Sequence, residues 1–409
     1  MCRRMTKYNR SPWIDTFPKS RTPAYPRYRG AARTEVVVIG GGLTGCTTAY
    51  ACAAAGVKVL LLEADRIGRG ATGSATGWIA TEPGVPFAQL EKSVGLRSAR
   101  RAWQAWRRAA LDFAALLRRL DIRCSLETRD ALLVARTPEE AARLQREQKA
   151  RRDAGVDGPM LNARAIRSEV ALDARAALRA KDGATIDPYR ACIGLAAAAS
   201  DRGALLFERS PVRRVTFTRK TADVHLRDGK IRTNRVIVAT AMPTLLFRGL
   251  IRHFWFKSSH LVLTNPLPAK IRRQLGSDRT IVRDLAEPAH AIRWLGEDRL
   301  LVAGADSEAV PARQRDKIVV QRTGQLMYEL STLYPDISGI APDYGWMTDY
   351  ALTGEGIPYI GPHRNYPHHL FAFGDASHSV TGAYLASRVM LRQHLGESEP
   401  ADEAFSFNR

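Results

Sequence analysis

The chain has 409 residues, a length that favours two or three domains over one. Hydrophobic residues make up 45% of it and charged residues 25%, which is typical of a globular protein with a large core and excludes a disordered chain. No apolar run approaches the ~20 residues of a membrane-spanning helix, and residues 1–30 lack the apolar centre of a signal peptide.

The net charge is +21, from 62 lysines and arginines against 41 aspartates and glutamates. A charge of this size raises the question of a nucleic-acid partner. The positive residues are nevertheless spread along the whole chain, and no basic patch with interleaved aromatic residues stands out. The pattern favours arginines distributed over exposed faces and argues against a nucleic-acid partner.

The cysteines are odd in number, widely separated and without a C-x-x-C pair. This spacing favours a reducing, cytoplasmic compartment and predicts neither a disulfide framework nor a metal site. The five are Cys2, Cys46, Cys52, Cys124 and Cys192.

Residues 1–33 contain four prolines and show neither helical nor strand periodicity, so an extended arm is expected. Three aromatic residues in this segment, Trp13, Phe17 and Tyr25, would strap the arm over the body of the protein.

The most informative pattern begins at residue 34. A wholly apolar run at residues 36–39 predicts a strand buried on both faces. Three glycines follow and open an alanine-rich helix that ends at Gly56, and a second strand, residues 57–62, leads to Glu63. The glycines are Gly40, Gly42 and Gly45, with G-x-G-x-x-G spacing.

Each of these glycines has a physical role in holding a dinucleotide. Gly40 permits the tight turn, Gly42 lets the backbone approach a pyrophosphate, and Gly45 lets helix and strand pack closely. The helix N-terminus directs free N–H groups and its positive dipole end at the phosphates. Glu63 can accept hydrogen bonds from both hydroxyls of an adenosine ribose. The stretch therefore predicts a dinucleotide site.

The next part of the chain alternates between helices and strands. Apolar residues at alternating spacings of three and four predict one long helix over residues 96–120. Trp103 and Trp106 lie on its apolar stripe, and core packing is the simplest interpretation for them. Residues 129–135 predict a strand, and a capping box at Thr137 begins a charged helix that reaches residue 154.

A proline after Asp187 indicates a helix N-terminus, and this helix is expected to end at Gly203. A strand at residues 204–207, a hairpin turn at Asp228-Gly229 and a buried strand at residues 235–239 follow.

Residues 246–353 differ in character. Strand-like segments at 260–263, 291–295 and 300–303 alternate with turns and with one helix at 317–333, which predicts a mostly antiparallel sheet.

Near the C-terminus, a loop at residues 354–361 precedes a buried strand at 370–373. Gly374-Asp375 follows this strand, and a helix begins near Val380. The chain thus carries a second strand, glycine turn and helix.

These motifs together resemble a known family. Beside the first glycine motif stand Gly68-Arg69-Gly70-Ala71-Thr72-Gly73, Ile186-Asp187-Pro188-Tyr189-Arg190, the GIPYIGP loop and the FAFGDASHSVTG segment. The set is similar to the FAD-dependent oxidoreductases of the D-amino-acid oxidase, glycine oxidase and sarcosine oxidase family. The resemblance spans nearly the whole chain. Trp13, Asp15 and Phe405-Ser406-Phe407 resemble the gamma-glutamylputrescine oxidase branch.

The resemblance implies an α/β fold with an α+β second domain. A Rossmann-like FAD-binding domain of glutathione-reductase type would carry an inserted, mostly antiparallel substrate domain. The expected boundaries are an arm at 1–33, an FAD-binding domain at 34–95, 182–245 and 354–409, and a substrate domain at 96–181 and 246–353.

It also implies FAD as the cofactor. Some family members attach flavin through a histidine in the loop at residues 70–77, where this chain has Ser74, so non-covalent FAD is expected. The expected cofactor-binding residues are Gly40, Gly42, Leu43, Thr44, Gly45, Glu63, Ala64, Arg69, Gly70, Ala71, Thr72, Ser74, Ala75, Thr76, Val212, Ala239, Thr240, Ala241, Gly374, Asp375, Val380, Thr381 and Gly382.

The implied reaction is hydride transfer from a carbon bearing an amine nitrogen to flavin N5. The product would be an imine that water hydrolyses, with oxygen or another acceptor taking the electrons. The substrate would be a small-molecule amine.

The candidate catalytic residues depart from the family pattern. Tyr350 stands where members acting on free α-amino acids have a carboxylate-binding arginine, which favours an amine without a free α-carboxylate nearby. Asp349 or Tyr350 would contact nitrogen, although Asp349 as a solvated loop acid is an equal alternative. Arg293 is an alternative candidate for binding a carboxylate, although an Arg293 side chain that faces outward is the simpler interpretation. His378 is flanked by serines where the family has glycines, and Ala241 stands where a glycine is common.

Two other functions stay open at this point. One is an FAD-binding subunit or scaffold without its own turnover, which the altered Ser-His-Ser turn and the missing arginine motivate. The other, a flavin enzyme acting on modified RNA, depends on the charge alone.

Overall fold

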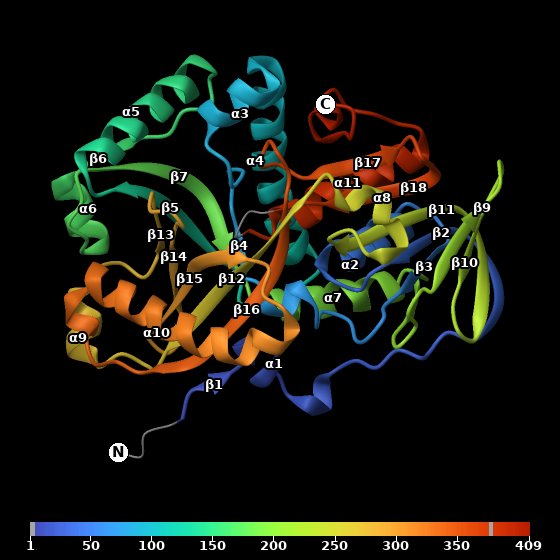
Figure 1. Cartoon of the computed structure of the whole chain (residues 1–409), viewed down its shortest axis with the longest axis horizontal. Coiled ribbons are helices and arrows are strands. Elements are labelled where there is room, and N and C mark those ends of the chain that lie inside the picture. The colour runs from blue at the N-terminus through green and yellow to red at the C-terminus, as the bar shows by residue number, and fades with distance from the viewer. Residues whose placement is uncertain (1–4, 376–378) are drawn as a thin grey trace.

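The computed structural model describes residues 5–375 and 379–409. Within these residues the strands form two sheets, one of eight and one of ten strands, that lie side by side in Figure 1 with helices around them. This is the mixed α/β architecture that the sequence predicts.

The eight-stranded sheet has the order β17-β18-β11-β2-β3-β8, and the hairpin β9-β10 extends it along the first half of β11. Neighbours from β18 to β8 are parallel, while β17, β10 and β9 are antiparallel to their partners. Its strands are β2 (Gly30–Ile39), β3 (Val59–Leu62), β8 (Leu205–Phe207), β9 (Arg214–Phe217), β10 (Ala222–His225), β11 (Gly229–Ala241), β17 (Tyr359–His363) and β18 (Tyr366–Phe373).

Three helices that pack together cover one face of this sheet: α2 (Leu43–Ala54), α7 (Pro188–Ser200) and α11 (Thr381–Leu395). Helix α2 is buried along most of its length because α7 and α11 flank it, which explains its small residues. The long helix α4 (Leu96–Arg119) packs on α11 and on α3 (Phe87–Val94). Trp103 and Trp106 are buried in this core, as the apolar stripe predicts.

The ten-stranded sheet has the order β1-β16-β12-β15-β14-β13-β5-β7-β4, with β6 on β7. All pairs are antiparallel except β1 with β16 and β13 with β5, so the predicted mostly antiparallel sheet is confirmed. Its strands are β1 (Lys7–Tyr8), β4 (Trp78–Ile79), β5 (Glu127–Ala135), β6 (Met160–Asn162), β7 (Ala176–Thr185), β12 (Trp255–Thr264), β13 (Thr280–Asp284), β14 (Ala291–Leu295), β15 (Arg299–Glu308) and β16 (Pro342–Leu352).

Helix α10 (Arg315–Leu333) packs on β12, β15 and β16, on the face of the ten-stranded sheet that points away from the smaller sheet (Figure 1). The remaining helices are short or lie at the periphery. They are α1 (Pro12–Asp15), α5 (Pro138–Asp153), α6 (Ala163–Val170), α8 (Arg248–Ile251) and α9 (Ala269–Gln274). The capping box that the sequence predicts at Thr137 begins α5.

The N-terminal arm is more regular than the sequence predicts. Strand β1 pairs with β16, α1 begins at Pro12, and β2 already begins at Gly30. A proline at the first helical position costs no hydrogen bond, so the proline-rich composition concealed a helix start. The predicted strapping is confirmed: Trp13 is buried, and its indole N–H donates to the carbonyl of Ala75 at 2.8 Å.

Two further differences concern strands. Residues 354–361 are not all loop, because β17 begins at Tyr359 and pairs with β18. Strand β4 pairs with β7 in the ten-stranded sheet, although the sequence assigned residues 34–95 to the FAD-binding domain. A two-residue strand has no periodicity of its own, so only its partner reveals it.

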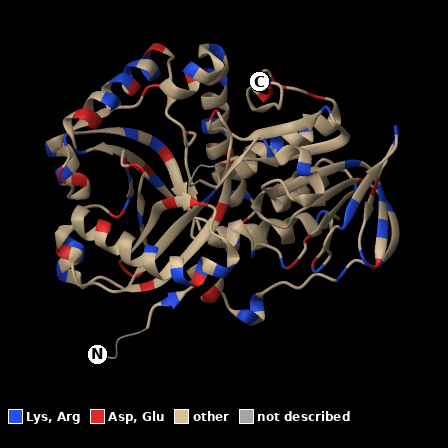
Figure 2. Ribbon diagram, in the orientation of Figure 1, with Lys and Arg blue, Asp and Glu red and all other residues tan. Residues whose placement is uncertain are grey.

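Charge is distributed over the fold. Figure 2 shows positive and negative residues interspersed along the helices and strands of both halves. Many of the arginines form ion pairs with acidic neighbours, for example Arg107 with Asp182 and Arg179 with Asp130.

His290 links the β13-β14 hairpin to α10. Its Nδ1 lies 2.6 Å from Oδ2 of Asp284, and its Nε2 lies 2.8 Å from Oε2 of Glu329. Burial by itself lowers the pKa of His290, but hydrogen bonds and charge attraction from both carboxylates outweigh burial and raise the pKa to about 9. The protonated imidazole therefore bridges the hairpin and the helix.

We expect the stabilisation from His290 to depend on pH. Because the folded-state pKa, about 9, lies above the ordinary 6.5, the contribution is complete below pH 6.5 and is lost as the pH rises through 9. Urea unfolding of the wild type and of His290→Gln should show a stability difference that shrinks over this range. A difference that stays constant with pH would contradict the assignment.

Candidate active site

The first glycine turn leaves no room for a side chain at Gly40 or Gly45. Gly40 has φ +110°, and a Cβ there would lie 2.6 Å from the carbonyl oxygen of Ala239 on β11. A Cβ on Gly45 would lie 1.8 Å from the carbonyl oxygen of Gly40. The spacing thus presses the first turn of α2 against the end of β2, as the motif requires.

Glu63 is fixed at this turn. Its Oε2 accepts from the N–H of Gly41 at 2.6 Å, and its Oε1 accepts from the N–H of Asp65 at 2.8 Å. A Cβ on Gly41 would lie 2.8 Å from Cβ of Glu63, so the acid and the glycine turn are in close contact. The carboxylate lies beside the turn, at the end of the adjacent parallel strand, where an adenosine ribose would require it.

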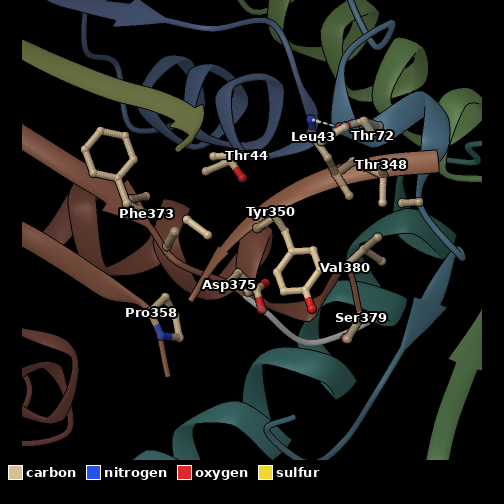
Figure 3. Close-up of a pocket in the computed structure, with 18 of the residues that line it drawn as sticks. Leu43, Thr44, Thr72, Thr348, Tyr350, Pro358, Phe373, Asp375, Ser379 and Val380 are labelled. Carbon is tan, nitrogen blue, oxygen red and sulfur yellow. Dashed lines mark hydrogen bonds between the residues drawn. The ribbon is translucent and has the colours of Figure 1, made fainter. Parts of the chain in front are cut away.

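A loop closes over the N-terminus of α2. The hydroxyl of Thr72 accepts from the N–H of Leu43 at 2.8 Å, as the dashed line in Figure 3 marks. The indole N–H of Trp346 donates to the carbonyl of Ser74 at 3.0 Å, and that of Trp13 donates to the next carbonyl. The loop at residues 71–76 is therefore held from the ten-stranded sheet and from the arm.

The second glycine turn follows β18. Gly374 has φ +85°, and a Cβ there would lie 2.6 Å from Cγ2 of Thr353. Gly382, in the first turn of α11, lies against the Asp375 carboxylate, where a Cβ would approach Oδ2 to 2.0 Å. The motif leaves room only for glycine at both positions.

The start of α11 is tied to β4 and the residue after it. The N–H of Val380 donates to the carbonyl of Trp78 at 2.8 Å, and the hydroxyl of Ser379 accepts from the N–H of Ala80 at 3.1 Å. The hydroxyl of Thr381 donates to the carbonyl of Ala80 at 2.7 Å. The ten-stranded sheet thus helps to position this helix N-terminus.

The two turns open on one cavity of about 160 Å³ (Figure 3). The N-terminal turns of α2 and α11 both line it, and β12 and β16 of the ten-stranded sheet form its opposite wall. The predicted cofactor-binding residues that line it are Leu43, Thr44, Ala71, Thr72, Ala75, Thr76, Ala241, Asp375, Val380 and Gly382.

The other predicted cofactor-binding residues do not line this cavity. Most of them form or adjoin the two glycine turns, or lie in the segment that follows Glu63. Val212 instead packs on the opposite side of the eight-stranded sheet. They are Gly40, Gly42, Gly45, Glu63, Ala64, Arg69, Gly70, Ser74, Val212, Ala239, Thr240, Gly374 and Thr381.

Tyr350 projects into the cavity from β16 (Figure 3). Its hydroxyl donates to Oδ2 of Asp306 on β15 at 2.6 Å. Burial, together with the Asp306 carboxylate, raises the pKa of Tyr350 above its ordinary value, so the phenol stays protonated. A neutral phenol in this place can orient a polar group but cannot act as a base at neutral pH.

Asp349 borders the same cavity, but its carboxylate is engaged elsewhere. The hydroxyl of Ser258 donates to Oδ1 at 2.6 Å, and Arg315 of α10 pairs with Oδ2. Asp349 is paired with Ser258 across β12 and β16, so it faces α10, whereas Tyr350 faces the other way. The reading of Asp349 as a solvated loop acid is wrong, because it lies on a strand and in an ion pair.

Arg293 is not outward-facing, in contrast to the simpler reading of the sequence. It is 4% exposed, and its Nη1 and Nη2 donate to the carbonyls of Gly77 and Ile186 at 3.3 and 3.2 Å. The ring of Trp13 lies 5.2 Å from the guanidinium. Arg293 does not line the cavity between the glycine turns, so it joins the sheet to the loop and arm.

The fourth candidate, His378, lies outside the described residues. Ala241, where the family pattern favours glycine, has φ +61°. A left-handed backbone at a residue with a Cβ costs about 1–2 kcal/mol, so this departure from the pattern stores strain at the cavity wall.

Sequence reasoning missed part of the wall. Ser259, Leu261 and Thr348 line the cavity from β12 and β16, and Ser379 lines it at the start of α11. The alternation of side chains along β12 could have placed Ser259 and Leu261 on one face of the strand. It could not have shown that this face borders the cavity. Within the described ranges, 5–375 and 379–409, no cluster of possible metal ligands and no helix able to span a membrane is found.

Two glycine turns opening on one cavity, beside an acid at the end of a neighbouring parallel strand, define a dinucleotide-binding protein with a two-sheet architecture. The chain belongs to the FAD dependent oxidoreductase family, DAO, whose model matches residues 35–393. FAD is therefore its cofactor.

Several known proteins resemble the chain. The gamma-glutamylputrescine oxidoreductase of Escherichia coli (strain K12) is 29% identical over 373 residues, which is 90% of this chain and 85% of that protein. The glycine oxidase of Bacillus licheniformis is 24% identical over 394 residues, covering 92% and 98%. The crystal structure of glycine oxidase from Geobacillus kaustophilus matches the fold with a TM-score of 0.72 at 22% identity, over 92% of this chain and 99% of that one.

The residues present fit FAD. The backbone at Gly40, Gly42 and Gly45 forms a cradle that a Cβ would fill, and Glu63 stands beside it. The cavity onto which the N-termini of α2 and α11 open is lined mostly by apolar side chains and backbone, as an aromatic ring system requires.

We expect Gly45→Ala to disrupt this cradle. The added methyl would meet the Gly40 carbonyl, so the turn must shift, at a cost of about 1–3 kcal/mol and with loss of bound FAD. Flavin content after purification and urea unfolding measure the two effects.

Gly324→Ala on α10 is the matched control. Nothing lies within 4 Å of a Cβ at that exposed helical position, so its stability should rise by about 0.5–1 kcal/mol with flavin content unchanged. Equal flavin content in the two variants would refute the cradle.

Proposed function

We propose that the protein oxidises an amine or secondary amino compound to an imine, with FAD held between the two glycine turns. The observation that carries this proposal is the convergence of the α2 and α11 N-termini on one cavity. The adenosine half would lie at Gly42 and Glu63, and the isoalloxazine half at Asp375, Val380 and Gly382.

The positive ends of the two helices have separate tasks in this arrangement. The N-terminus of α2 favours the pyrophosphate, and that of α11 favours the negative charge that a reduced flavin carries. Ser379 and Thr381 hold the α11 end on Ala80, so its orientation is set before a ligand enters.

FAD supplies the acceptor for the hydride that leaves the substrate carbon, at flavin N5. The nitrogen loses a proton as the C–N double bond forms, and water then hydrolyses the imine to a carbonyl compound and an amine. No protein nucleophile is required. The protein must orient the C–H bond and limit access of water.

Tyr350 is assigned to the substrate nitrogen. Its phenol faces the cavity and is kept neutral by burial, whereas the Asp349 carboxylate is engaged by Ser258 and Arg315. Ser259 and Thr348 line the same wall and offer hydroxyl groups. The named activities of the relatives, on gamma-glutamylputrescine and on glycine, support an amino compound as substrate.

The test is anaerobic reduction of the bound flavin. A panel of polyamines, N-methyl amines and amino acids should include compounds that bleach the visible flavin absorption, and Tyr350→Phe should slow bleaching about 10-fold, the effect of one lost hydrogen bond. Flavin that dithionite bleaches but no panel member bleaches would favour an FAD-binding subunit without turnover. Peroxide formation in air separates an oxidase from a dehydrogenase.

We also expect the flavin to be non-covalent, because the loop at residues 70–77 carries Ser74 and no histidine. Acid precipitation should release all of the yellow colour into the supernatant. Flavin that stays with the precipitated protein would disprove this expectation.

A further inference from the structure

A second cavity, of about 210 Å³, lies beside the first. Ser379 lines both cavities. The walls of the second cavity are the loop at residues 82–86 and the strands β5, β7 and β13 of the ten-stranded sheet. The proposed function gives this space no role.

The floor of the second cavity is apolar. Four aliphatic side chains of β5 and β7 line it, and they share one face of the sheet because they alternate along their strands. These residues are Ala131, Leu133, Leu178 and Ala180. Such a surface accommodates a hydrocarbon chain.

Arg283 of β13 is partly exposed and lines this cavity, and it makes few of the contacts that a guanidinium can make. Its Nη2 donates to the carbonyl of Gly84 at 3.1 Å, and its buried Nε has no hydrogen-bond partner. Among the described residues no carboxylate forms an ion pair with it. Burial lowers the pKa of the guanidinium, and the charges of Glu82 and Asp284 act in the opposite direction.

The neighbouring arginines differ from Arg283. Arg151 is held by two carboxylates, because its Nε donates to Glu147 at 2.6 Å and its Nη1 donates to Glu82 at 2.7 Å. Arg143 is 49% exposed and lies near Glu287 at the rim. Glu82 forms an ion pair with Arg151, and its charge also acts on Arg283. Of these three arginines, Arg283 is the one without a carboxylate at ion-pair distance among the described residues.

The two cavities adjoin at Ser379, which lines both. Tyr350 lines the first cavity and Arg283 lines the second. A substrate nitrogen at Tyr350 and an anion at Arg283 would thus lie in adjoining cavities. This separates the acidic group from the reacting carbon.

We propose that Arg283 binds the carboxylate of the substrate, which is an amine carrying its acidic group at the far end of a short aliphatic chain. The inference deepens the proposed function and depends on it for the position of the reacting nitrogen. It also accounts for the arginine missing at Tyr350: the anion site is on another strand, further from the flavin.

The first experiment measures anion binding to the FAD-loaded protein by calorimetry. Glutarate is the probe and glutaramide its neutral counterpart. Arg283→Met should weaken glutarate binding about 10- to 100-fold, the worth of a charge-assisted hydrogen bond, and leave glutaramide unchanged. Arg283→Lys should retain part of the affinity because it keeps the charge. Arg143→Gln, at the rim, should bind like the wild type.

The second experiment compares 5-aminovalerate with pentylamine in anaerobic flavin reduction. The wild type should prefer 5-aminovalerate at low concentration, and Arg283→Met should lose that preference through a higher half-saturating concentration. Equal glutarate affinity in the wild type and Arg283→Met would overturn the assignment, as would equal use of the two amines.

Failure of the proposed function has a different signature. A purified protein that is colourless and takes up no FAD would contradict the proposed oxidation reaction. A glutarate affinity that depends on Arg283 would still support the anion site in that case. Flavin reduced by amines, with no effect of Arg283→Met in either experiment, would overturn the anion site alone.

Discussion

The parallel pairing of β11 with β2 on one side and β18 on the other is the constraint on which the site depends. Parallel strands end at the same edge of a sheet, so the turns that follow β2 and β18 must open in the same direction. Residues 40 and 374 are far apart in sequence, yet only one strand separates their turns. Close contacts with neighbouring strands and loops leave no room for a side chain at Gly40, Gly45 and Gly374.

The ten-stranded sheet completes this arrangement in two ways. Its strands β12 and β16 form the wall that faces the helix N-termini, and Trp346 holds the loop over α2. Strand β4 and Ala80 hold the start of α11. The wall that would face substrate and the helix that would face the flavin are thus parts of one hydrogen-bonded framework.

Three arginines, of which Arg151 and Arg293 are buried, show how the protein distributes charge near the site. Arg151 is neutralised by two glutamates, and Arg293 is held by two backbone carbonyls against an indole ring. Arg283 donates to one backbone carbonyl, that of Gly84, and has no carboxylate at ion-pair distance among the described residues. It is also more exposed than the other two, so a ligand in the second cavity could reach it.

Local sequence determined the parts of the fold whose physics is local. The glycine spacing, the Asp187 and Thr137 helix starts and the apolar runs of β2 and β18 predict their elements because caps, turns and burial act within a few residues. Period-two alternation along β16 likewise separates Asp349 from Tyr350. The pairing of β16 with β12, and the packing of α10 on the other face of the sheet, decided which of these two side chains points into the cavity. Only the tertiary structure settled three features: the inward direction of Arg293, the short strand β4 and the surroundings of Arg283. Each of them depends on segments about 100 or more residues away in the sequence.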